Sequence, residues 1–450
     1  MSDTKLILEL LKKVEDLTKE VADLRERLSK YENPKNSDNS SMPPSSDANR
    51  PKKNQSLRKS SGKKLGGQSG HKGNTLRMTA TPDLVVELLS EYCKNCGASL
   101  ETMPIVKKQS RQTIDIAPIK VIHTEYQSFI KRCSCGCNSE MNFPSGINAP
   151  VSYGENIESL VGYFHARQYL PFARMKEVFN DVFHINISES GVHCLLNRFA
   201  QKTSPLYQMI KQRIQNSKVV GSDETGVKVN GNKHWFWTWQ TPKLTYITHS
   251  NNRARATIDS HFPQGFPQST LVHDGWRPQL STKAKHHQSC LPHLLRHLNY
   301  LNEKHKNVSW GVDFQNILYK ALDIKNKYTK NNKVFSLKRM EILQQLENLL
   351  SKPPDKKQKE LYTFYKRMCR ERQHLFTFLF LTEVPSDNNA SERAIRNVKV
   401  KQKISGQFKT EQTAQNFAKI RSVIDTTIKN GMNVLETMKL IAKLERYNAY

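Results

Sequence analysis

The chain has 450 residues, a length that allows roughly two to four domains, and 37% of them are hydrophobic, enough to build a sizeable core. Lysine and arginine number 70 against 41 aspartates and glutamates, so the net charge is +29 and a polyanion such as nucleic acid is the expected partner. This composition excludes a wholly disordered chain. A charged N-terminus and the lack of any apolar run of about 18 residues also exclude a secretory signal and a transmembrane helix, so we expect a cytosolic protein without a membrane partner.

Residues 1–32 carry the clearest periodicity. Apolar residues recur there at alternating steps of three and four, at Ile7, Leu10, Val14, Leu17, Val21, Leu24, Leu28 and Tyr31. β-Branched residues at one seam position and leucine at the other favour a parallel two-stranded coiled coil, and a helix that packs on its own domain is the alternative. We therefore predict a homodimer or a higher oligomer.

Residues 33–83 are rich in Ser, Asn, Pro, Gly and Lys, which predicts a disordered basic linker. The glycine-rich segment 66–73 inside it lacks the spacing of a nucleotide-binding loop, and no strand precedes it. A flexible basic arm along DNA and a plain linker both fit this composition.

Residues 84–150 alternate apolar and polar positions, which predicts a small β-rich unit. Five cysteines lie in it in two groups, Cys93 and Cys96, then Cys133, Cys135 and Cys137. Clustered cysteines in a reducing compartment favour a metal over disulfides, and four thiolates suit a tetrahedral zinc ion. We predict a structural zinc site made of four of the five, with one cysteine of the second group left over.

Residues 151–215 show a helical period in three segments, with a turn before the last one at Asn186-Ile-Ser188. This arrangement is typical of a helix-turn-helix DNA-binding unit, and an ordinary helical connector is the alternative. Cys194 lies beside the apolar face of the last helix, so we expect it in the core.

From Lys218 the period changes to two, which predicts a strand to Val229, a hairpin turn at Asn230-Gly231 and a returning strand over residues 234–240. Asp223 shares a face of the first strand with valines, a costly place for a carboxylate that has no function. Glu224 points the other way and is expected to be solvated. The tryptophans of the returning strand, Trp235, Trp237 and Trp239, are expected to pack in the core.

A second carboxylate, Asp274, ends the next predicted strand just before Gly275. A side chain there projects from the edge of a sheet into a site, and a turn-forming aspartate is the alternative. On the following helix, His293 and His297 are four residues apart. Because no third ligand accompanies them, we expect no zinc between these two histidines.

The third carboxylate, Glu392, lies in the first turn of a predicted helix, on one stripe with Arg396, Lys399 and Lys403. A merely solvated helix face is the alternative for this stripe. Two strand carboxylates and one helix carboxylate are hard ligands of the kind that two Mg²⁺ ions need for phosphoryl transfer. The basic residues around Glu392 would then bind the DNA backbone.

At this point the motifs become recognisable. They are the segment 66–73, the cysteine pairs, Asp223-Glu-Thr, Asp274-Gly-Trp, Cys290-Leu-Pro-His-Leu-Leu-Arg296 and Asp387-Asn-Asn-Ala-Ser-Glu-Arg393. In this order they resemble the transposases of the insertion sequence 66 family over nearly the whole chain. The resemblance implies a multidomain α+β protein with an RNase H-like catalytic domain at 216–299 and 384–450 and a helical insertion at 300–383.

The resemblance also implies a catalytic Asp-Asp-Glu triad, which corresponds to Asp223, Asp274 and Glu392 here, with Mg²⁺ or Mn²⁺ as the cofactor. Such an enzyme cleaves DNA at the ends of its element and joins the 3′-hydroxyls to target DNA, in the bacterial cytoplasm at the nucleoid. Its N-terminal parts would bind the terminal inverted repeats, and a need for accessory proteins is left open. The candidate DNA contacts are His293, Arg296, Arg393, Arg396, Lys399, Lys401 and Lys403.

The sequence departs from the family at two points. The second cysteine group is C-x-C-x-C, where the family usually has C-x2-C, and Asn397 stands where the family commonly has proline, so the helix is expected to continue. Two other functions fit part of the sequence. A non-catalytic zinc-containing DNA-binding regulator explains the charge and the cysteines but not Asp223, and an RNase H-like nuclease would lack strand joining.

Overall fold

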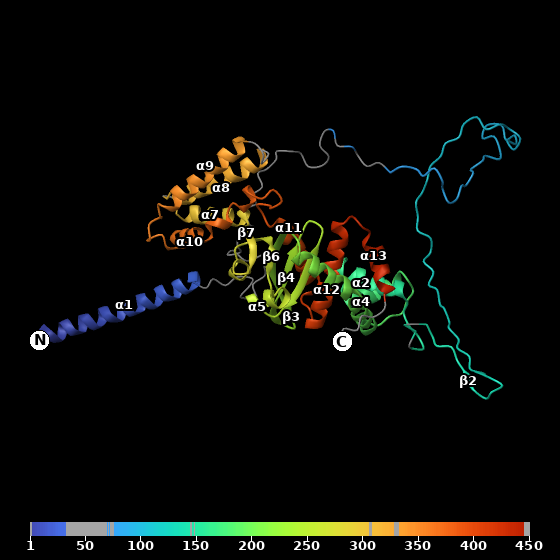
Figure 1. The fold of residues 1–450 in the computed structure, drawn as a ribbon, viewed down its shortest axis with the longest axis horizontal. Helices are drawn as coiled ribbons and strands as arrows, with labels where there is room; N and C mark the ends of the chain where they lie inside the picture. Colours follow the sequence, from blue (N-terminus) through green and yellow to red (C-terminus); the bar gives the residue numbers. More distant parts are fainter. Residues whose placement is uncertain are drawn as a thin grey trace. The chain divides into compact units, whose positions relative to one another are not determined.

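A computed structural model of the chain describes residues 2–32, 70, 72, 76–144, 146–147, 149–305, 308–327 and 333–444. It divides into two units, Met1–Thr113 and Ile114–Tyr450, and each is described by itself (Figure 1). Most of the predicted basic linker lies outside the described residues. Among the helices that are described, none is long and apolar enough to cross a lipid bilayer.

The first unit begins with helix α1 (Ser2–Glu32), over the residues that carry the heptad pattern. Its seam leucines stand in solvent in the single chain, with Leu17 59% and Leu24 52% exposed. An apolar seam of this kind is buried when a second helix packs on it.

The cysteines lie in tight turns with little other regular structure around them. In the first unit, a bridge between Tyr92 and Ser99 closes a turn around Cys93 and Cys96. In the second unit, strands β1 (Lys131–Arg132) and β2 (Asn138–Ser139) pair antiparallel around the other three cysteines. Within residues 84–144 the β structure predicted from the alternation is therefore limited to these short pairings.

The second unit continues with helices α2 (Glu155–Ala166), α3 (Phe172–Asp181) and α4 (Glu189–Gln215). Ser188 caps α4, because its Oγ accepts a hydrogen bond from the Gly191 backbone N–H at 3.0 Å. The apolar faces of all three helices join the sheet in one hydrophobic core. Cys194 is exposed on α4, so the prediction that it lies in this core is wrong.

A five-stranded mixed sheet forms the centre of this unit. Its strands are β3 (Val219–Val229), β4 (Asn232–Gln240), β5 (Thr245–Ser250), β6 (Phe266–His273) and β7 (Ala284–Ser289), in the order β5-β4-β3-β6-β7. β3, β4 and β5 are antiparallel neighbours, whereas β3, β6 and β7 are parallel. The predicted hairpin joins β3 to β4, with positive φ at Asn230 and Gly231 as a type I′ turn requires.

Helices cover the sheet and close the core. Short helices α5 (Arg255–His261) and α6 (Arg277–Leu280) flank β6. Further on, α11 (Asn389–Ser405) packs on β3 and β4, α12 (Glu411–Lys429) packs on β5 and α4, and α13 (Val434–Ala442) packs on α2 (Figure 1). Trp237 and Trp239 are fully buried, as predicted, but Trp235 is only half-buried.

Between β7 and α11 the chain forms a helical segment with its own core. It contains α7 (Leu291–Lys304), α8 (Trp310–Lys327), α9 (Lys333–Leu350), α10 (Lys359–Glu371) and the 3₁₀ turns η1 (Arg372–His374) and η2 (Thr377–Leu379). Its apolar side chains, such as Phe314 and Phe364, form a second cluster that reaches the sheet at Val272. The helices and the mixed sheet together form the α+β architecture expected from the sequence.

Candidate active site

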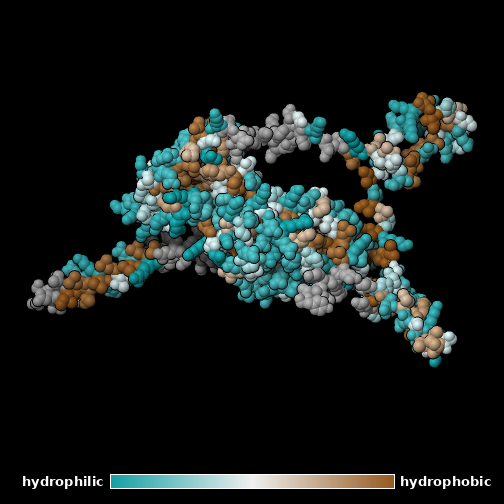
Figure 2. Space-filling view, viewed as in Figure 1, coloured by the Kyte–Doolittle hydropathy of each residue, from teal (hydrophilic) through white to brown (hydrophobic). Residues whose placement is uncertain are grey.

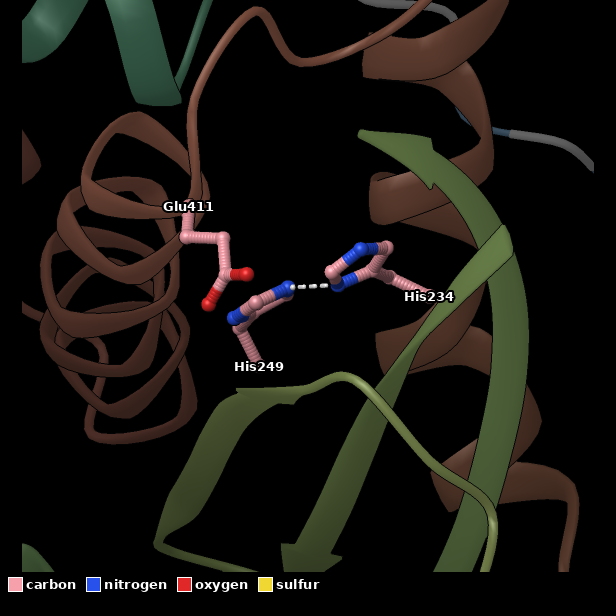
Figure 3. Close-up of side chains that lie close together, drawn as sticks. All are labelled: His234, His249 and Glu411. Atoms are coloured by element: carbon pink, nitrogen blue, oxygen red, sulfur yellow. Dashed lines mark hydrogen bonds between the residues drawn. The ribbon is translucent and has the colours of Figure 1, made fainter. Parts of the chain in front are cut away.

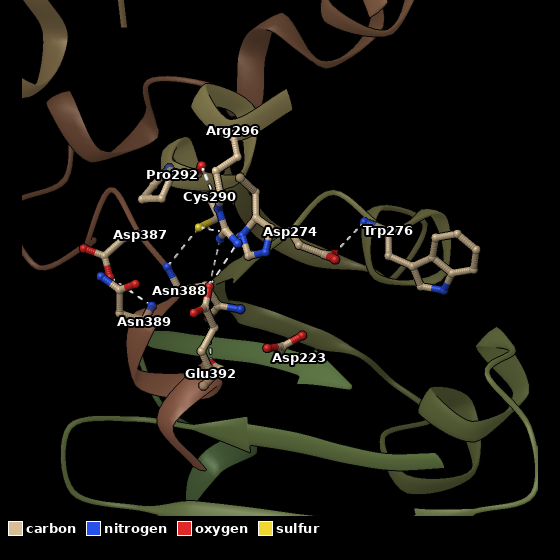
Figure 4. Close-up of polar contacts among 12 residues, drawn as sticks. Asp223, Asp274, Trp276, Cys290, Pro292, Arg296, Asp387, Asn388, Asn389 and Glu392 are labelled. Atoms are coloured by element: carbon tan, nitrogen blue, oxygen red, sulfur yellow. Dashed lines mark hydrogen bonds and ion pairs between the residues drawn. The ribbon is translucent and has the colours of Figure 1, made fainter. Parts of the chain in front are cut away.

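The three predicted carboxylates come from three different elements that meet at one edge of the sheet (Figure 4). In the parallel pair β3–β6, Gly221 is the partner of Val272. Asp223 and Asp274 each lie two residues beyond this pair, Asp223 inside β3 and Asp274 directly after the end of β6, so they occupy neighbouring positions. Glu392 lies in the first turn of α11, which packs on β3.

Gly221 allows α11 to approach β3 closely. A Cβ atom at this position would lie 2.5 Å from Gln240 Nε2 and 2.6 Å from Ser391 Oγ. Asn388, the residue that caps α11, donates from Nδ2 to the Ser222 carbonyl oxygen at 2.7 Å and accepts from Ser391 Oγ at 2.6 Å. These contacts hold the start of α11 against the strand that carries Asp223, and Glu392 follows directly.

The electrostatics of Asp223 show how close the acidic groups are. Burial is the main cause that raises the pKa of Asp223 to about 8, and the nearby charges of Glu224, Asp274 and Glu392 raise it further. The Glu224 backbone N–H donates to Asp223 Oδ1 at 2.9 Å and opposes the shift. The site thus brings several acidic groups together in a partly buried place. A cation binds most favourably in such a place, because water screens its attraction to the carboxylates less.

Glu224 is buried, so the prediction that it is solvated is wrong. Its side chain is 1% exposed and accepts hydrogen bonds from Arg253 Nε at 2.8 Å and from Gln279 Nε2 at 2.7 Å. Burial, and then the charge of Asp274, raise the pKa of Glu224 to about 7. Strand alternation gave the side on which Glu224 points, but not that Arg253 and Gln279 would cover that side.

Arg253 also links two tryptophans beside the acidic groups. Its guanidinium carbon lies 4.0 Å from the ring centroid of Trp276 and 4.9 Å from that of Trp235. The amino-acid sequence gave no sign of this stack, because its members come from three separate loops and strands. Trp235 therefore binds cations at the surface of the sheet instead of packing fully in the core.

Asp274 combines the two roles considered for it. Its Oδ1 accepts from the Trp276 backbone N–H at 2.9 Å, which is a turn contact (Figure 4), and its charge is still close enough to raise the pKa values of Asp223 and Glu224. Gly275 has a φ of +87°, and a Cβ there would collide with Arg367 Nη2 from α10. Arg367 donates to the Asp274 carbonyl oxygen at 3.4 Å, so the helical segment reaches the site.

Glu392 is surrounded by basic groups and by the start of α7. Its carboxylate oxygens lie 3.4 Å from Arg296 Nη2, 3.7 Å from His293 Nδ1 and 4.0 Å from Arg396 Nη2. Cys290 Sγ is 3.2 Å from His293 Nδ1, and the ligand atoms of Cys290, His293 and Glu392 all lie within 4.8 Å of one another.

His293 therefore has neighbours that the sequence spacing did not reveal. Sequence reasoning paired it with His297, whose ring instead packs on Phe364 at 5.0 Å between centroids. Burial raises the pKa of Cys290 to about 12, so its thiol stays protonated, and it accepts a hydrogen bond from the Asn388 backbone N–H at 3.3 Å.

The basic residues of α11 divide by face. Arg393, Arg396, Lys399 and Lys403 are exposed, and Lys399 Nζ donates to the Gly226 carbonyl oxygen. Lys401 is only 3% exposed and donates to the Leu170 carbonyl oxygen at 3.1 Å. Burial lowers the pKa of Lys401 to about 7. The prediction that Lys401 contacts DNA is therefore wrong, because its ammonium group lies inside the protein.

The helix continues through Asn397 as predicted. Asn397 Oδ1 accepts a hydrogen bond from Tyr169 Oη at 2.9 Å, and α11 runs on to Ser405. A proline at this position would have removed a backbone donor from the middle of the helix.

The two cysteine turns have the same local geometry, although they belong to different units. Gly97 N–H donates to the Cys93 carbonyl oxygen, and Gly136 N–H donates to that of Cys133, both at 2.9 Å and both with the glycine at positive φ. Hydrogen bonding from the Cys96 backbone lowers the pKa of Cys93, and that from Cys135 lowers the pKa of Cys133. Each turn thus favours a thiolate, the form in which cysteine binds zinc.

Comparison with known protein families gave two matches, and one of them covers the sheet, the helical segment and the acidic site. A family model described as "Transposase IS66 family" matches residues 150–416, more than half of the chain, and this range contains all three carboxylates. A second one, described as a family of unknown function (DUF6444), matches residues 3–77. The comparison with curated proteins gave no match.

Proposed function

The chain belongs to the IS66 family of transposases, and we propose that it cuts the phosphodiester bonds at the ends of a DNA element and joins the freed 3′-hydroxyls to target DNA. The observation that carries this proposal is the meeting of Asp223, Asp274 and Glu392 at one edge of the sheet (Figure 4). The mixed sheet with two parallel strands beside an antiparallel set supports an RNase H-like catalytic domain.

The donor set fits hard divalent cations, Mg²⁺ or Mn²⁺. Three carboxylates from three elements supply only oxygen ligands, and the pKa of Asp223 is raised first by burial and then by the neighbouring carboxylates. When bound, such ions activate the attacking oxygen and stabilise the leaving oxygen of the displacement. The residues around the carboxylates keep them in place, since Asn388 fixes the start of α11, and Arg296 and His293 hold the Glu392 carboxylate.

Basic residues around the site are the proposed contacts to the DNA backbone. Arg296 on α7 and Arg393, Arg396, Lys399 and Lys403 on α11 are exposed, and His293 on α7 is half-buried. Because they lie on the helix that carries Glu392 and on the one that contacts it, DNA bound to them would lie over the carboxylates. Phosphate contacts of this kind position the duplex and make its binding depend on salt.

The parts before the sheet are proposed to assemble the complex. Four of the five clustered cysteines would hold a structural zinc ion, α1 would pair with a second copy of itself, and helices α2 to α4 would contact the terminal repeats. Their boundaries follow the sequence, with a coiled coil at 1–32, a linker at 33–83, a zinc-binding unit at 84–150 and a DNA-binding region at 151–215.

Cleavage and joining of DNA that carries the element's ends test the proposal. We expect Mg²⁺-dependent activity from the native protein and a loss of about 1000-fold or more in Asp223→Asn, Asp274→Asn and Glu392→Gln, each of which removes a ligand charge at similar volume. DNA affinity should hold or rise. Asp259→Asn is the matched control, because Asp259 is exposed and pairs with Arg255 at 3.3 Å, away from the site.

Other outcomes would point to the two rival functions. Native-like cleavage in Asp223→Asn would refute the catalytic assignment. Cleavage without joining would support an RNase H-like nuclease. Specific binding to the element's ends without cleavage by the native protein would support a zinc-containing regulator.

A further inference from the structure

A second cluster of metal-binding residue types lies at another place on the sheet, where β4 and β5 meet the start of α12. It consists of His234 on β4, His249 on β5 and Glu411 at the start of α12 (Figure 3). His234 Nδ1 and His249 Nε2 are 3.0 Å apart, and the ligand atoms of all three residues lie within 4.8 Å of one another. Neither the family match nor the proposed catalysis gives these residues a role.

The fold places them together through strand register and a helix end. Phe236 is the partner of His249 in the antiparallel pair β4–β5, so His234, two residues away on the same face, is the diagonal neighbour of His249. The imidazole rings stack with their centroids 5.0 Å apart and their planes 16° from parallel. Helix α12, capped by Thr410, begins next to them and brings in Glu411.

The polarity of the cluster is unusual for its surroundings. His234 and His249 are 8% and 7% exposed, and around them lie the core aromatics Phe236 and Phe408. A single proton can bridge the two nitrogens, one as donor and one as acceptor. The Glu411 carboxylate, in contrast, is exposed, and within the part of the chain that the structure describes it makes no hydrogen bond or ion pair at 4.0 Å or less.

From this geometry we infer that His234, His249 and Glu411 form a binding site for a divalent transition-metal ion of the zinc class. Two imidazole nitrogens and one carboxylate oxygen leave a fourth, tetrahedral position for water, on the side where Glu411 meets solvent. Ligands about 2.0–2.1 Å from a tetrahedral ion are about 3.3 Å apart, close to the observed separation of the histidine nitrogens. The ion would take the place of the shared proton, and the imidazole that donates it would change to its other tautomer, so that both ligands stay neutral.

Electrostatics favour the neutral ligand form. Burial, and then the neighbouring His234, lower the pKa of His249 to about 4, so its imidazole is uncharged at neutral pH. The two neighbouring titratable groups that affect His249 are His234 and Glu411. The site offers no thiolate, unlike the cysteine turns, and two of its three ligands are imidazoles, unlike the carboxylate set of Asp223, Asp274 and Glu392, so the three sites select different ions.

A bound ion would have a structural role. It would tie α12 to β4 and β5 just after the loop 406–410, which itself pairs with β3, where Phe408 N–H donates to the Lys228 carbonyl oxygen at 3.0 Å. That loop follows α11, the helix that carries Glu392. The ion would thus brace the chain between the catalytic helix and the core.

The molecule contains a matched control pair. His273 Nε2 and His287 Nδ1 are also 3.0 Å apart and buried, but their rings meet edge to face at 74° and His374 is their neighbour. Among the described residues this second pair has no carboxylate that completes a ligand set within 4.8 Å. A hydrogen-bonded histidine pair alone should therefore bind no ion.

Zinc content and thermal unfolding of the full chain test the inference. After removal of metal with a chelator and dialysis against Zn²⁺, we expect the native protein to hold one equivalent more than His249→Gln. His287→Gln should hold the native number. Zn²⁺ should also raise the Tm of the native protein by a few degrees more than that of His249→Gln, because only the native fold offers this site.

Glu411→Gln serves as the second variant, since its side chain is exposed and the metal-free protein should unfold at the native Tm. It should weaken zinc binding at this site by about tenfold or more. In Co²⁺-loaded protein, the difference spectrum between the native chain and either variant should lack a sulfur-to-cobalt charge-transfer band, because no thiolate is involved. Equal zinc content and equal Zn²⁺-induced Tm shifts in the native protein and both variants would overturn the inference and leave a hydrogen-bonded histidine pair.

Discussion

The sheet and the two segments that precede it in the chain differ in where their apolar side chains lie. In the sheet domain, side chains such as Phe236, Trp237 and Phe417 are fully buried in one core. Along α1 and the cysteine-bearing residues 76–144, apolar side chains stand in solvent, with Leu88 91% and Val106 97% exposed. Figure 2 shows this contrast as long hydrophobic stretches along these segments, against a largely hydrophilic face over the sheet domain.

This difference indicates how each part becomes ordered. The sheet domain gains its stability from its own buried surface, and it can therefore hold charged groups such as Asp223 and Glu224 in partly buried positions. The cysteine turns and α1 bury little surface within a single chain, so we propose that a zinc ion orders the turns and that a second helix stabilises α1. Removing the zinc ion or the second helix should disrupt these segments and leave the sheet domain intact.

The largest effect is expected from breaking the seam of α1. Replacing both Leu17 and Leu24 with Lys places four charges in the seam of a dimer and removes about 6 kcal/mol or more of apolar burial. Sedimentation should then show monomers that keep the native Tm of the sheet domain. An unchanged oligomer would mean that α1 is not the contact between chains.

The next largest effect concerns the cysteine turns. Cys93→Ser should remove the zinc held there and speed proteolysis within residues 76–144, while the sheet domain keeps its Tm. Loss of the sulfur-to-cobalt charge-transfer band in Co²⁺-loaded protein identifies this site. Cys194→Ser, a change at an exposed cysteine outside the turns, is the control. Protein purified without chelators that contains no thiolate-bound metal would contradict the prediction.

Within the sheet domain, the position of α11 can be tested without touching a carboxylate. Gly221→Ala should push Ser391 and Gln240 away and shift Glu392 relative to Asp223, which we expect to lower cleavage by about 100-fold. DNA affinity should not change. Gly226→Ala is the matched control on the same strand, because its Cβ would meet only ordinary contacts at 3.6 Å. Equal cleavage rates in the two variants would refute the positioning role of Gly221.

The raised pKa of Asp223 should make the stability of the protein depend on pH. Without divalent ions, the pKa of folded Asp223 is about 8 because the side chain is largely buried, whereas an unfolded aspartate has the ordinary pKa of 3.8. The folded state binds the extra proton between these values, so the free energy of unfolding falls as the pH rises through this window. Asp223→Asn should raise that free energy at pH 8 by about 1–3 kcal/mol, after allowance for partial exposure, and by less at pH 5.

Urea titrations at both pH values measure this difference. Asp259→Asn should change neither, since its carboxylate is exposed. Saturating Mg²⁺ should stabilise the native protein at pH 8 and reduce the advantage of Asp223→Asn. The same stability gain at pH 5 and pH 8 would argue against a protonated Asp223 in the metal-free fold.

The smallest expected effect is a difference in DNA binding between substitutions at two lysines of α11. Lys403→Ala should weaken binding and reduce the salt slope by about one, because an exposed cation is lost. Lys401→Met should leave DNA binding unchanged but lower stability by about 1–3 kcal/mol, because the carbonyl oxygens of Tyr169 and Leu170 lose their donor. Filter binding at several salt concentrations distinguishes them, and a loss of salt slope in Lys401→Met would contradict its buried position.

The amino-acid sequence alone determined the features that depend on local pattern. The period of α1, the hairpin at Asn230-Gly231 and the continuation of α11 through Asn397 each follow from residue spacing or from the backbone preferences of single residues. The three carboxylates could also be selected from the sequence, because a strand aspartate among valines and a glutamate in a basic stripe conflict with their surroundings.

Tertiary structure decided everything that depends on which element covers a given side chain. Lys401 and Lys403 belong to the same basic run, yet the loop before α3 buries the first and leaves the second in solvent. Glu224 is buried by Arg253 and Gln279, and the histidines of β4 and β5 meet Glu411 only because α12 begins beside them. Periodicity gives the direction in which a side chain points from its own element, but burial and partners come from residues far away in sequence, which local spacing does not encode.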